Sequence, residues 1–390
     1  MMRCIPIMLL LLSPFILSGC YDKLEVSDTI VVIAHGWDIQ GDNKLLSAQL
    51  ALTPPREGQL QRDPKYMTLC STAPSFAQAA RELSLTLPRQ PLWSMADTIV
   101  ISEKLALRDT TLFIDTATRN PHIRYNVKLF VARGVTPAEI FEVQVPPENY
   151  SGTALEKIIR IQTGQAGIYM PIDLKDFIYR NSTEGIEPVI PQIVLESQKG
   201  QKGIRLQGTA VFKGHQMVGE LDPAQTRGLA LMKSGAINST IFNIKNPLIG
   251  REEEPLKMSN NLCLELTSYR VKVKPLINGS HIKMQIVLEG EGNIVEDNNT
   301  SSICEPETVQ DIEKEAARAL KQDIQMCIKQ AQGLNSDIMG WGLAINRIHP
   351  RTWQKIRDYW PEIFPGIPAN IQVKYRLNQP YLQKDAFLQQ

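Results

Sequence analysis

The 390-residue chain lacks an excess of charge of either sign, with 42 Lys and Arg against 41 Asp and Glu. A protein dedicated to nucleic acid neutralises phosphates with clustered basic residues, so this balance argues against nucleic-acid binding. Aromatic residues are few, at 6%, while the hydrophobic fraction of 43% is ordinary. The composition is that of a globular protein, and it excludes collagen, coiled-coil fibres and extended disorder.

Long apolar runs are missing as well. Beyond the N-terminus, no segment reaches the roughly 18 consecutive apolar residues typical of a membrane-spanning helix. The N-terminal apolar run, residues 5–17, follows Arg3 and is too short to cross a bilayer. A positive start, a short apolar core and small residues at the end are typical of a secretory signal peptide. We therefore predict a signal peptide over residues 1–19.

The predicted signal peptide ends in Leu17-Ser18-Gly19-Cys20, which resembles the bacterial lipobox. In a lipobox the chain is cut before the Cys, and the Cys thiol receives a diacylglyceryl group. We therefore predict cleavage between Gly19 and Cys20, and S-diacylglycerol and N-acyl modification of Cys20. Two or more acyl chains anchor a protein stably without a basic patch, so we expect a protein that is lipid-anchored to a membrane and folded outside it. The end of an ordinary signal peptide and a buried first strand are the alternative interpretations.

Cysteine is scarce, with six residues in the whole chain. Cys4 would leave with the signal peptide and Cys20 would carry the lipid. The other four could form two disulfides in three connectivities, or they could be small hydrophobic residues in core or half-exposed positions, which we favour. No C-x-x-C pair and no close Cys/His spacing occurs, so we predict no metal site. These four are Cys70, Cys263, Cys304 and Cys327.

The hydrophobic periodicity predicts an α+β protein with two or three mixed α/β domains, as the length also suggests. In the first half, period-2 and period-3.6 patterns alternate. The predicted strands are residues 29–34, 45–52, 97–101 and 125–131, and the predicted helices are residues 75–87, 105–118, 151–162 and 173–179.

A polar, glycine-bearing stretch separates the two halves of the chain. It follows the proline-flanked residues 188–191 and covers residues 198–203, where we predict the main domain boundary. The predicted organisation is therefore an N-terminal α/β domain (20–197), a C-terminal α+β domain (204–378) with a further division near residue 300 left open, and a C-terminal tail (379–390).

The second half has the pattern of an antiparallel sheet backed by a long helix. An Asn278-Gly279 turn joins strands at 269–274 and 281–288, and Gly290 and Gly292 suggest a bulge or bend in the continuing strand. Residues 307–332 carry an apolar stripe over about 39 Å of helix, enough to back a whole sheet. The remaining predicted elements are a hairpin at 204–213 and 217–221, helices at 222–234, 336–348 and 352–360, and a last strand at 371–377.

Catalytic and ligand-binding motifs are missing from the chain. It contains no nucleophile elbow, zinc-protease, P-loop or dinucleotide-binding string, so we predict no enzyme and no cofactor. A small basic cluster around Pro121 consists of Arg119, His122 and Arg124. It could bind an anionic ligand, but clusters of this kind more commonly form structural hydrogen bonds within a loop. The five histidines are isolated from one another, with none at metal-binding spacing: His35, His122, His215, His281 and His349.

An ordered set of landmarks runs through the chain: 19–25 (GCYDKLE), 36–38 (GWD), 71–81 (STAPSFAQAAR), 87–89 (LPR), 99–103 (IVISE), 119–134 (RNPHIRYNVKLFVARG), 206–221 (LQGTAVFKGHQMVGEL), 226–228 (TRG), 337–342 (DIMGWG), 349–353 (HPRTW), 359–360 (YW) and Phe364. The set covers essentially the whole mature chain in collinear order. In this set the chain resembles the Ger(x)C family, the lipoprotein C subunits of nutrient germinant receptors in endospore-forming bacteria. Departures are Tyr21, where members commonly have Trp, Trp37, where they usually have Ile, and Ser94, where they often have His.

The resemblance implies a non-enzymatic receptor subunit on the outer face of the spore inner membrane. Its implied partners are an integral membrane A subunit and a multi-pass B subunit, which together with it trigger spore germination. The B subunit is the implied holder of the nutrient, so direct nutrient binding by this chain is left open. The alternative is a solute-binding lipoprotein of an uptake system, which should have two similar α/β lobes and be stabilised by its ligand. An envelope hydrolase is disfavoured by the missing motifs.

Overall fold

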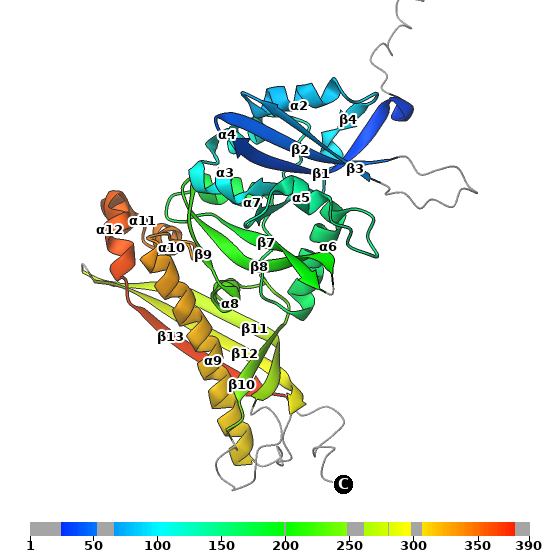
Figure 1. Cartoon of the computed structure of the whole chain (residues 1–390). Helices are drawn as coiled ribbons and strands as arrows, with labels where there is room; N and C mark the ends of the chain where they lie inside the picture. The colour runs from blue at the N-terminus through cyan, green and yellow to red at the C-terminus, as the bar shows by residue number, and fades with distance from the viewer. Residues whose placement is uncertain are drawn as a thin grey trace, which may run out of the picture.

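The computed structural model describes residues 25–52, 66–198, 200–247, 261–279, 281–297 and 306–378. A nine-stranded sheet and a four-stranded sheet lie at opposite ends of an elongated molecule, with helices packed on both (Figure 1). The predicted α+β class with mixed α/β parts is confirmed. Gly19 and Cys20, the tail 379–390 and Cys304 lie outside the described residues.

The large sheet has the order β3-β2-β1-β5-β6-β7-β8-β9, and β4 pairs with the start of β1. The first three strands are antiparallel, whereas β5, β6 and β7 run parallel to β1. The β1–β2 turn contains Gly41 at φ +62°, a conformation that favours glycine. The strands are β1 (Thr29–Gln40), β2 (Asn43–Ala51), β3 (Tyr66–Ala73), β4 (Gln90–Leu92), β5 (Thr98–Ser102), β6 (Lys128–Ala132), β7 (Val189–Gln198), β8 (Gln201–Lys213) and β9 (Gln216–Leu221).

The large sheet continues across the stretch where the sequence suggests a domain boundary. Residues 188–191 do not interrupt the structure, because β7 begins at Val189. It forms a hairpin with β8, in which Val189 pairs with Val211 and Gln198 pairs with Gln201. Pro191 is tolerated there because β6 pairs only with Gln192 and Ile193, just beyond it. The domain division itself stays a prediction, and the sheet extends to Leu221.

Helices cover both faces of the large sheet. The helices α2, α3, α4 and α7 contribute to the main core on one face, and α5 and α6 to a smaller core on the other. The single helix predicted over 105–118 is instead α3 and α4, because the Asp109 carboxylate accepts hydrogen bonds from the N–H and hydroxyl of Thr111 and breaks the helix. The bounds are α2 (Phe76–Ser84), α3 (Glu103–Arg108), α4 (Thr111–Arg119), α5 (Pro137–Phe141), α6 (Ser151–Gln165) and α7 (Leu174–Ser182), with 3-10 turns η1 (Val26–Asp28) and η2 (Trp93–Met95).

The small sheet has the order β10-β11-β12-β13. Its first three strands are antiparallel, as predicted for this half, but β13 joins β12 in parallel. A register shift leaves Thr267 extra on β11, between the pairs Leu266–Gly292 and Ser268–Glu291. A Cβ on Gly292 would lie 1.8 Å from the Glu265 carbonyl oxygen, so only glycine fits there. The strands are β10 (Thr240–Lys245), β11 (Asn261–Asn278), β12 (His281–Asp297) and β13 (Ala369–Leu377).

The long helix predicted from the apolar stripe is α9 (Pro306–Gly333), which packs on β13, β10 and α8 (Pro223–Leu231). Its stripe from Ile312 through Leu320 to Cys327 is buried. The helix predicted to start at residue 336 begins only at Trp341, because Gly340, at φ +76°, turns the chain first. The remaining elements are α10 (Trp341–Ile348), α11 (Pro350–Ile356), η3 (Arg357–Tyr359), α12 (Trp360–Ile363) and η4 (Phe364–Gly366).

A candidate ligand pocket between the two sheets

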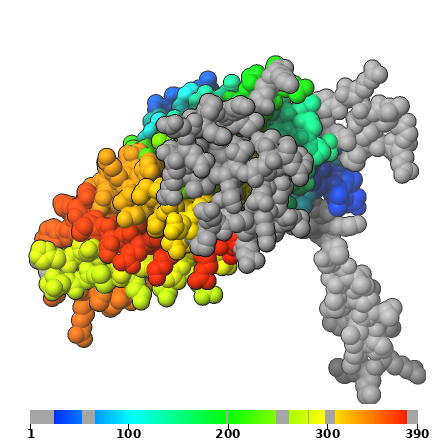
Figure 2. Space-filling model, turned by 90° about the horizontal axis from the view of Figure 1, so that it is seen from below, coloured from blue at the N-terminus to red at the C-terminus, as the bar shows by residue number. Residues whose placement is uncertain are grey.

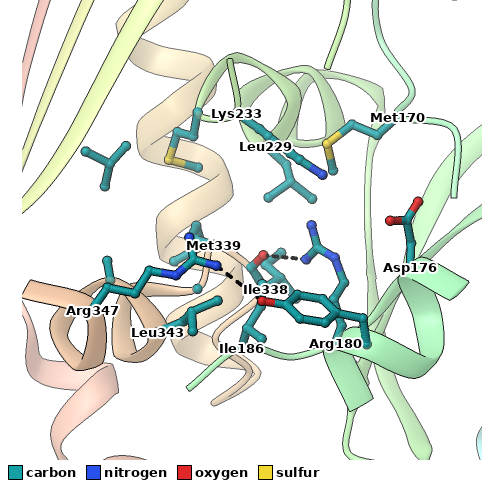
Figure 3. Close-up of a pocket in the computed structure, with 15 residues that line it drawn as sticks. Met170, Asp176, Arg180, Ile186, Leu229, Lys233, Ile338, Met339, Leu343 and Arg347 are labelled. Atoms are coloured by element: carbon teal, nitrogen blue, oxygen red, sulfur yellow. Dashed lines mark hydrogen bonds between the residues drawn. The ribbon is translucent and has the colours of Figure 1, made fainter. Parts of the chain in front are cut away.

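A cavity of about 320 Å³ lies where the helices of the large sheet meet the C-terminal half of the chain (Figure 3). Its walls come from α7, α8 and α10, from the loop before α10, and from β11. Apolar side chains such as Met170, Leu229 and Leu343 line much of it. Three cations and the Asp176 carboxylate supply its charge. The cavity therefore combines an apolar wall with a net positive charge.

Arg180 is the most deeply buried cation of the cavity. Helix α7 begins at the cap residue Asp173, and spacings of three residues place Leu174, Phe177 and Arg180 on its buried face. The Arg180 side chain is only 6% exposed. Its Nη1 donates to the carbonyl oxygens of Ile338, at 3.1 Å, and Glu187, at 3.4 Å. Burial lowers the pKa of Arg180, but an arginine stays charged in proteins.

Lys233 lies just after α8, on the opposite wall. Its ammonium points toward the Arg180 guanidinium across the cavity (Figure 3). Desolvation and then the charge of Arg180 lower the pKa of Lys233, while Asp176 and Asp173 oppose that shift. At the cavity edge a third cation, Arg347, donates from Nη2 to the hydroxyl of Tyr179 at 3.2 Å. Among the described residues, neither Arg180 nor Lys233 forms a salt bridge.

Asp337 holds the loop that forms one wall of the cavity. Its buried carboxylate accepts hydrogen bonds from the backbone N–H groups of Gly340, Trp341 and Gly342, at 2.8–3.0 Å, and from the Trp360 indole at 3.2 Å. Burial raises the pKa of Asp337 to about 7, against the effect of these donors. The 337–342 landmark is therefore a structural cap at the start of α10.

The basic cluster noted in the sequence does not form a buried site. Arg119 pairs with Asp115 at 2.7 Å, and His122 and Arg124 are exposed. Arg119 and His122 line a second cavity of about 660 Å³, between α2 and α4, but Arg124 does not. The Arg119 pair lies within α4, so hydrogen bonding of the cluster within its own loop stays a prediction.

The histidines and cysteines are also scattered in the structure. His35 is buried and accepts a hydrogen bond from the Trp37 indole, while His215 lies 3.0 Å from the Asn181 amide. The part of the chain that the structure describes holds no group of three His, Cys, Asp or Glu residues that could bind a metal ion. Cys70 (exposed), Cys263 (half-buried) and Cys327 (buried) form no disulfide among the described residues.

Sequence reasoning missed Arg180, on α7, and Lys233, which lies 53 positions later and just after α8. The one available signal was Arg180 itself, a cation on the apolar face of a short helix.

Within the described ranges, no helix has both the length and the apolar character needed to cross a bilayer.

Two family models match the chain in order. Residues 22–195 match the N-terminal domain of spore germination proteins. Residues 207–381 match the spore germination B3/GerAC-like C-terminal domain. The residues between the two matched regions belong to the β7–β8 hairpin. Together the two models account for both sheets of the structure.

Relatives and a solved structure agree with these models. In Bacillus subtilis (strain 168), the chain is 22% identical to spore germination protein KC over 402 residues, covering 98% of this chain and 97% of the relative. It is 21% identical to spore germination protein B3 over 372 residues, covering 93% and 94%. Its fold is similar to the crystal structure of the GerBC protein, with a TM-score of 0.55 at 18% identity, covering 89% of this chain and 98% of that one.

Proposed function

Because the chain belongs to the GerAC family of spore germination proteins, we propose that it is the lipid-anchored C subunit of a spore nutrient germinant receptor. The observation that carries this proposal is the match to both family domains, in order, along nearly the whole chain. The proposed role is non-enzymatic: assembly or signalling with the A and B membrane subunits during germination. The proposed location is the outer face of the spore inner membrane.

The proposed anchor is Cys20, diacylated and N-acylated after cleavage behind Gly19. Glu25, the first described residue, is five positions after Cys20, and an extended chain over that separation spans at most about 18 Å. A lipid on Cys20 would therefore hold the fold close to the bilayer surface. Membrane-embedded partner subunits would lie within reach there.

The outer face of the small sheet is a candidate contact for such a partner. In Figure 2, β13 (red) lies at the molecular surface beside the yellow-green strands of the β11–β12 hairpin. On β11, β12 and β13, the register places six exposed cations on this face and three exposed acids, Glu289, Glu291 and Glu296. One of the cations, Lys374, lies 3.8 Å from the Glu289 carboxylate. We call this surface the basic sheet face; its cations are Arg270, Lys272, Lys274, Lys283, Lys374 and Arg376. It would suit an acidic surface on a partner subunit.

The alternative of a solute-binding lipoprotein is not favoured. Such a protein should have two similar α/β lobes around a cleft. Here one half contains a nine-stranded mixed sheet and the other a four-stranded sheet backed by a single long helix. The two halves differ in strand number, strand order and helix placement.

Co-purification tests the receptor proposal. The chain would be tagged at Gln390, extracted gently from the spore inner membrane, and its companions identified by mass spectrometry. We expect A- and B-type membrane subunits, with recovery lost or reduced in Cys20→Ser and unchanged in Cys70→Ser, which removes an exposed thiol elsewhere. Recovery of a transporter permease and ATPase, or no loss in Cys20→Ser, would contradict the proposal.

A charge reversal tests the proposed contact surface in the same assay. Lys272→Glu with Lys274→Glu changes the charge of the basic sheet face by four units without touching the core. We expect it to lower recovery of the partner subunits, more strongly at low salt. The matched control is Lys321→Glu with Lys329→Glu, the same charge change at exposed positions of α9. Equal losses in both doubles would exclude a specific role for this face.

A further inference from the structure

The cavity of Figure 3 presents two cations to each other without a carboxylate bound to either. Arg180 and Lys233 face each other across it, and the pKa of Lys233 is lowered partly by that repulsion. Among the described residues, the nearby Asp176 carboxylate also forms no salt bridge. The charges of Asp176 and Asp337 favour the charged form of Arg180, and those of Asp176 and Asp173 favour the charged form of Lys233, without a salt bridge to either cation among the described residues. An anion bound between the two cations would stabilise both further.

We propose that this cavity binds a small organic monocarboxylate, with its carboxylate between Arg180 and Lys233 and its short apolar part against Met170 and Leu229. The proposal rests on the cavity alone and holds whether or not the chain is a receptor subunit.

The hydrogen-bonding state of Arg180 indicates a carboxylate. A guanidinium has five N–H donors in a planar fork. Nη1 donates hydrogen bonds to the carbonyl oxygens of Ile338 and Glu187. Nε and Nη2 have no hydrogen-bond partner among the described residues. The side chain is 94% buried and projects into the cavity, so these donors are open to water or to a ligand that enters it. A planar carboxylate accepts from such a fork through both oxygens.

The rest of the cavity restricts the ligand to a small molecule with one negative charge and an apolar part. Its volume of about 320 Å³ is near the lower end of ligand pockets, which start at roughly 300 Å³. Met170, Leu229 and Leu343 offer apolar contacts but no donors. Asp176 at the edge disfavours a second negative charge on the ligand. A multiply charged phosphate ester fits this environment poorly.

Binding of isovalerate to the full chain, purified in mild detergent, tests the proposal. Isovalerate carries one carboxylate on a short branched chain, and isovaleramide has the same shape without the charge. We expect isovalerate to give saturable heat in calorimetry and to raise the melting temperature, with no response to isovaleramide. Inorganic phosphate should bind more weakly. Absence of saturation by isovalerate up to about 10 mM would overturn the proposal, as would equal binding of the amide or of phosphate.

Variants assign the binding to the two cations. Lys233→Gln should weaken isovalerate binding about tenfold or more, because one charge-assisted hydrogen bond is lost. Arg180→Lys keeps the charge but loses the fork, and it should weaken binding as well. Lys321→Gln, at an exposed position of α9, is the control and should bind like the wild type. Since Lys233 is an exposed residue of the cavity wall, Lys233→Gln should fold, and unchanged binding by that variant would refute the site.

Discussion

At the scale of single residues, His35 is the clearest case of a titratable group held neutral by the fold. It is 1% exposed on β1 and packs against Trp37 and Trp93. The Trp37 indole donates to Nδ1 at 2.6 Å, so the ring proton is on Nε2, which has no partner among the described residues. Burial lowers the pKa of His35 to about 3. A protonated His35 would place an unpaired charge in this aromatic core.

The stability of the protein should therefore depend on pH through His35. In the unfolded chain His35 binds a proton below its ordinary pKa of about 6.5, whereas in the folded chain it does so only near pH 3. Between these values protonation favours the unfolded chain, so the free energy of unfolding decreases as the pH falls. Between pH 7.5 and 5 the loss is about 2 kcal/mol. Urea unfolding of wild type and His35→Phe at both pH values measures it: the wild type should lose about that much more than the variant. Carboxyl groups such as Asp337 cancel in the difference, and equal losses would refute the assignment.

At the scale of elements, the packing of α8 on α9 depends on close backbone contact. Gly228 lies on α8 where a Cβ would come within 2.2 Å of the Asp323 carbonyl oxygen of α9. Next to it, Arg227 Nε donates to the Asp323 carboxylate at 2.7 Å, in a mostly buried ion pair. Burial raises the pKa of Asp323 and the Arg227 charge opposes that shift. Gly228 lets the backbones of α8 and α9 come close together, and the Arg227–Asp323 ion pair fixes their position along each other.

Alanine substitutions at two helical glycines should have opposite effects. Gly228→Ala gains helix propensity of up to about 1 kcal/mol, but its Cβ forces the backbones of α8 and α9 apart, at a cost of about 1–3 kcal/mol. We expect a net loss of stability. In Gly164→Ala, on α6, the Cβ meets nothing closer than the Asn238 amide at 4.0 Å, so a gain of a few tenths of a kcal/mol is expected. Urea midpoints at constant m-value measure both, and a stabilised Gly228→Ala would show that the helices separate without cost.

Elements with strong local patterns could be predicted from the sequence, and those defined by distant partners could not. The apolar stripe of α9 and the Asn278-Gly279 hairpin are local signals, and both were found. Strands β3, β7 and β10 were not predicted: β3 and β10 each pair with a neighbouring strand across a long connection, and β7 begins in the stretch where the sequence suggests a domain boundary. The parallel addition of β13 to β12 likewise depends on contacts about 85 residues apart in the sequence.

The candidate site could not be predicted for the same reason. Arg180 and Lys233 are single cations, and no motif describes their spacing in the sequence. They line one cavity only because the fold places α7, α8 and α10 around it. Asp337 was found only as part of a family landmark. Its role as acceptor for four donors follows from the turn at Gly340.

At the scale of the whole molecule, one hydrophobic core runs through both sheets. It contains Val32 and Leu129 of the large sheet, Leu229 of α8 and Ile286 of the small sheet. The chain passes from one sheet to the other through β9 and α8, and α8 packs on α9. A continuous core of this kind favours a single cooperative unfolding transition over two independent ones.

Fragments test where the first folding unit ends. A fragment of residues 20–197, which follows the predicted domain boundary, lacks β8 and β9 and exposes the buried β7 residues Val189, Ile190 and Ile193. We expect it to aggregate or to lack a cooperative urea transition. A fragment of residues 20–221 keeps every strand of the large sheet and should regain strand content by circular dichroism, with lower stability than the full chain because α8 and α9 are missing. If the shorter fragment instead unfolds cooperatively with the midpoint of the longer one, the β7–β8–β9 pairing contributes little and the boundary at 197 marks an autonomous domain.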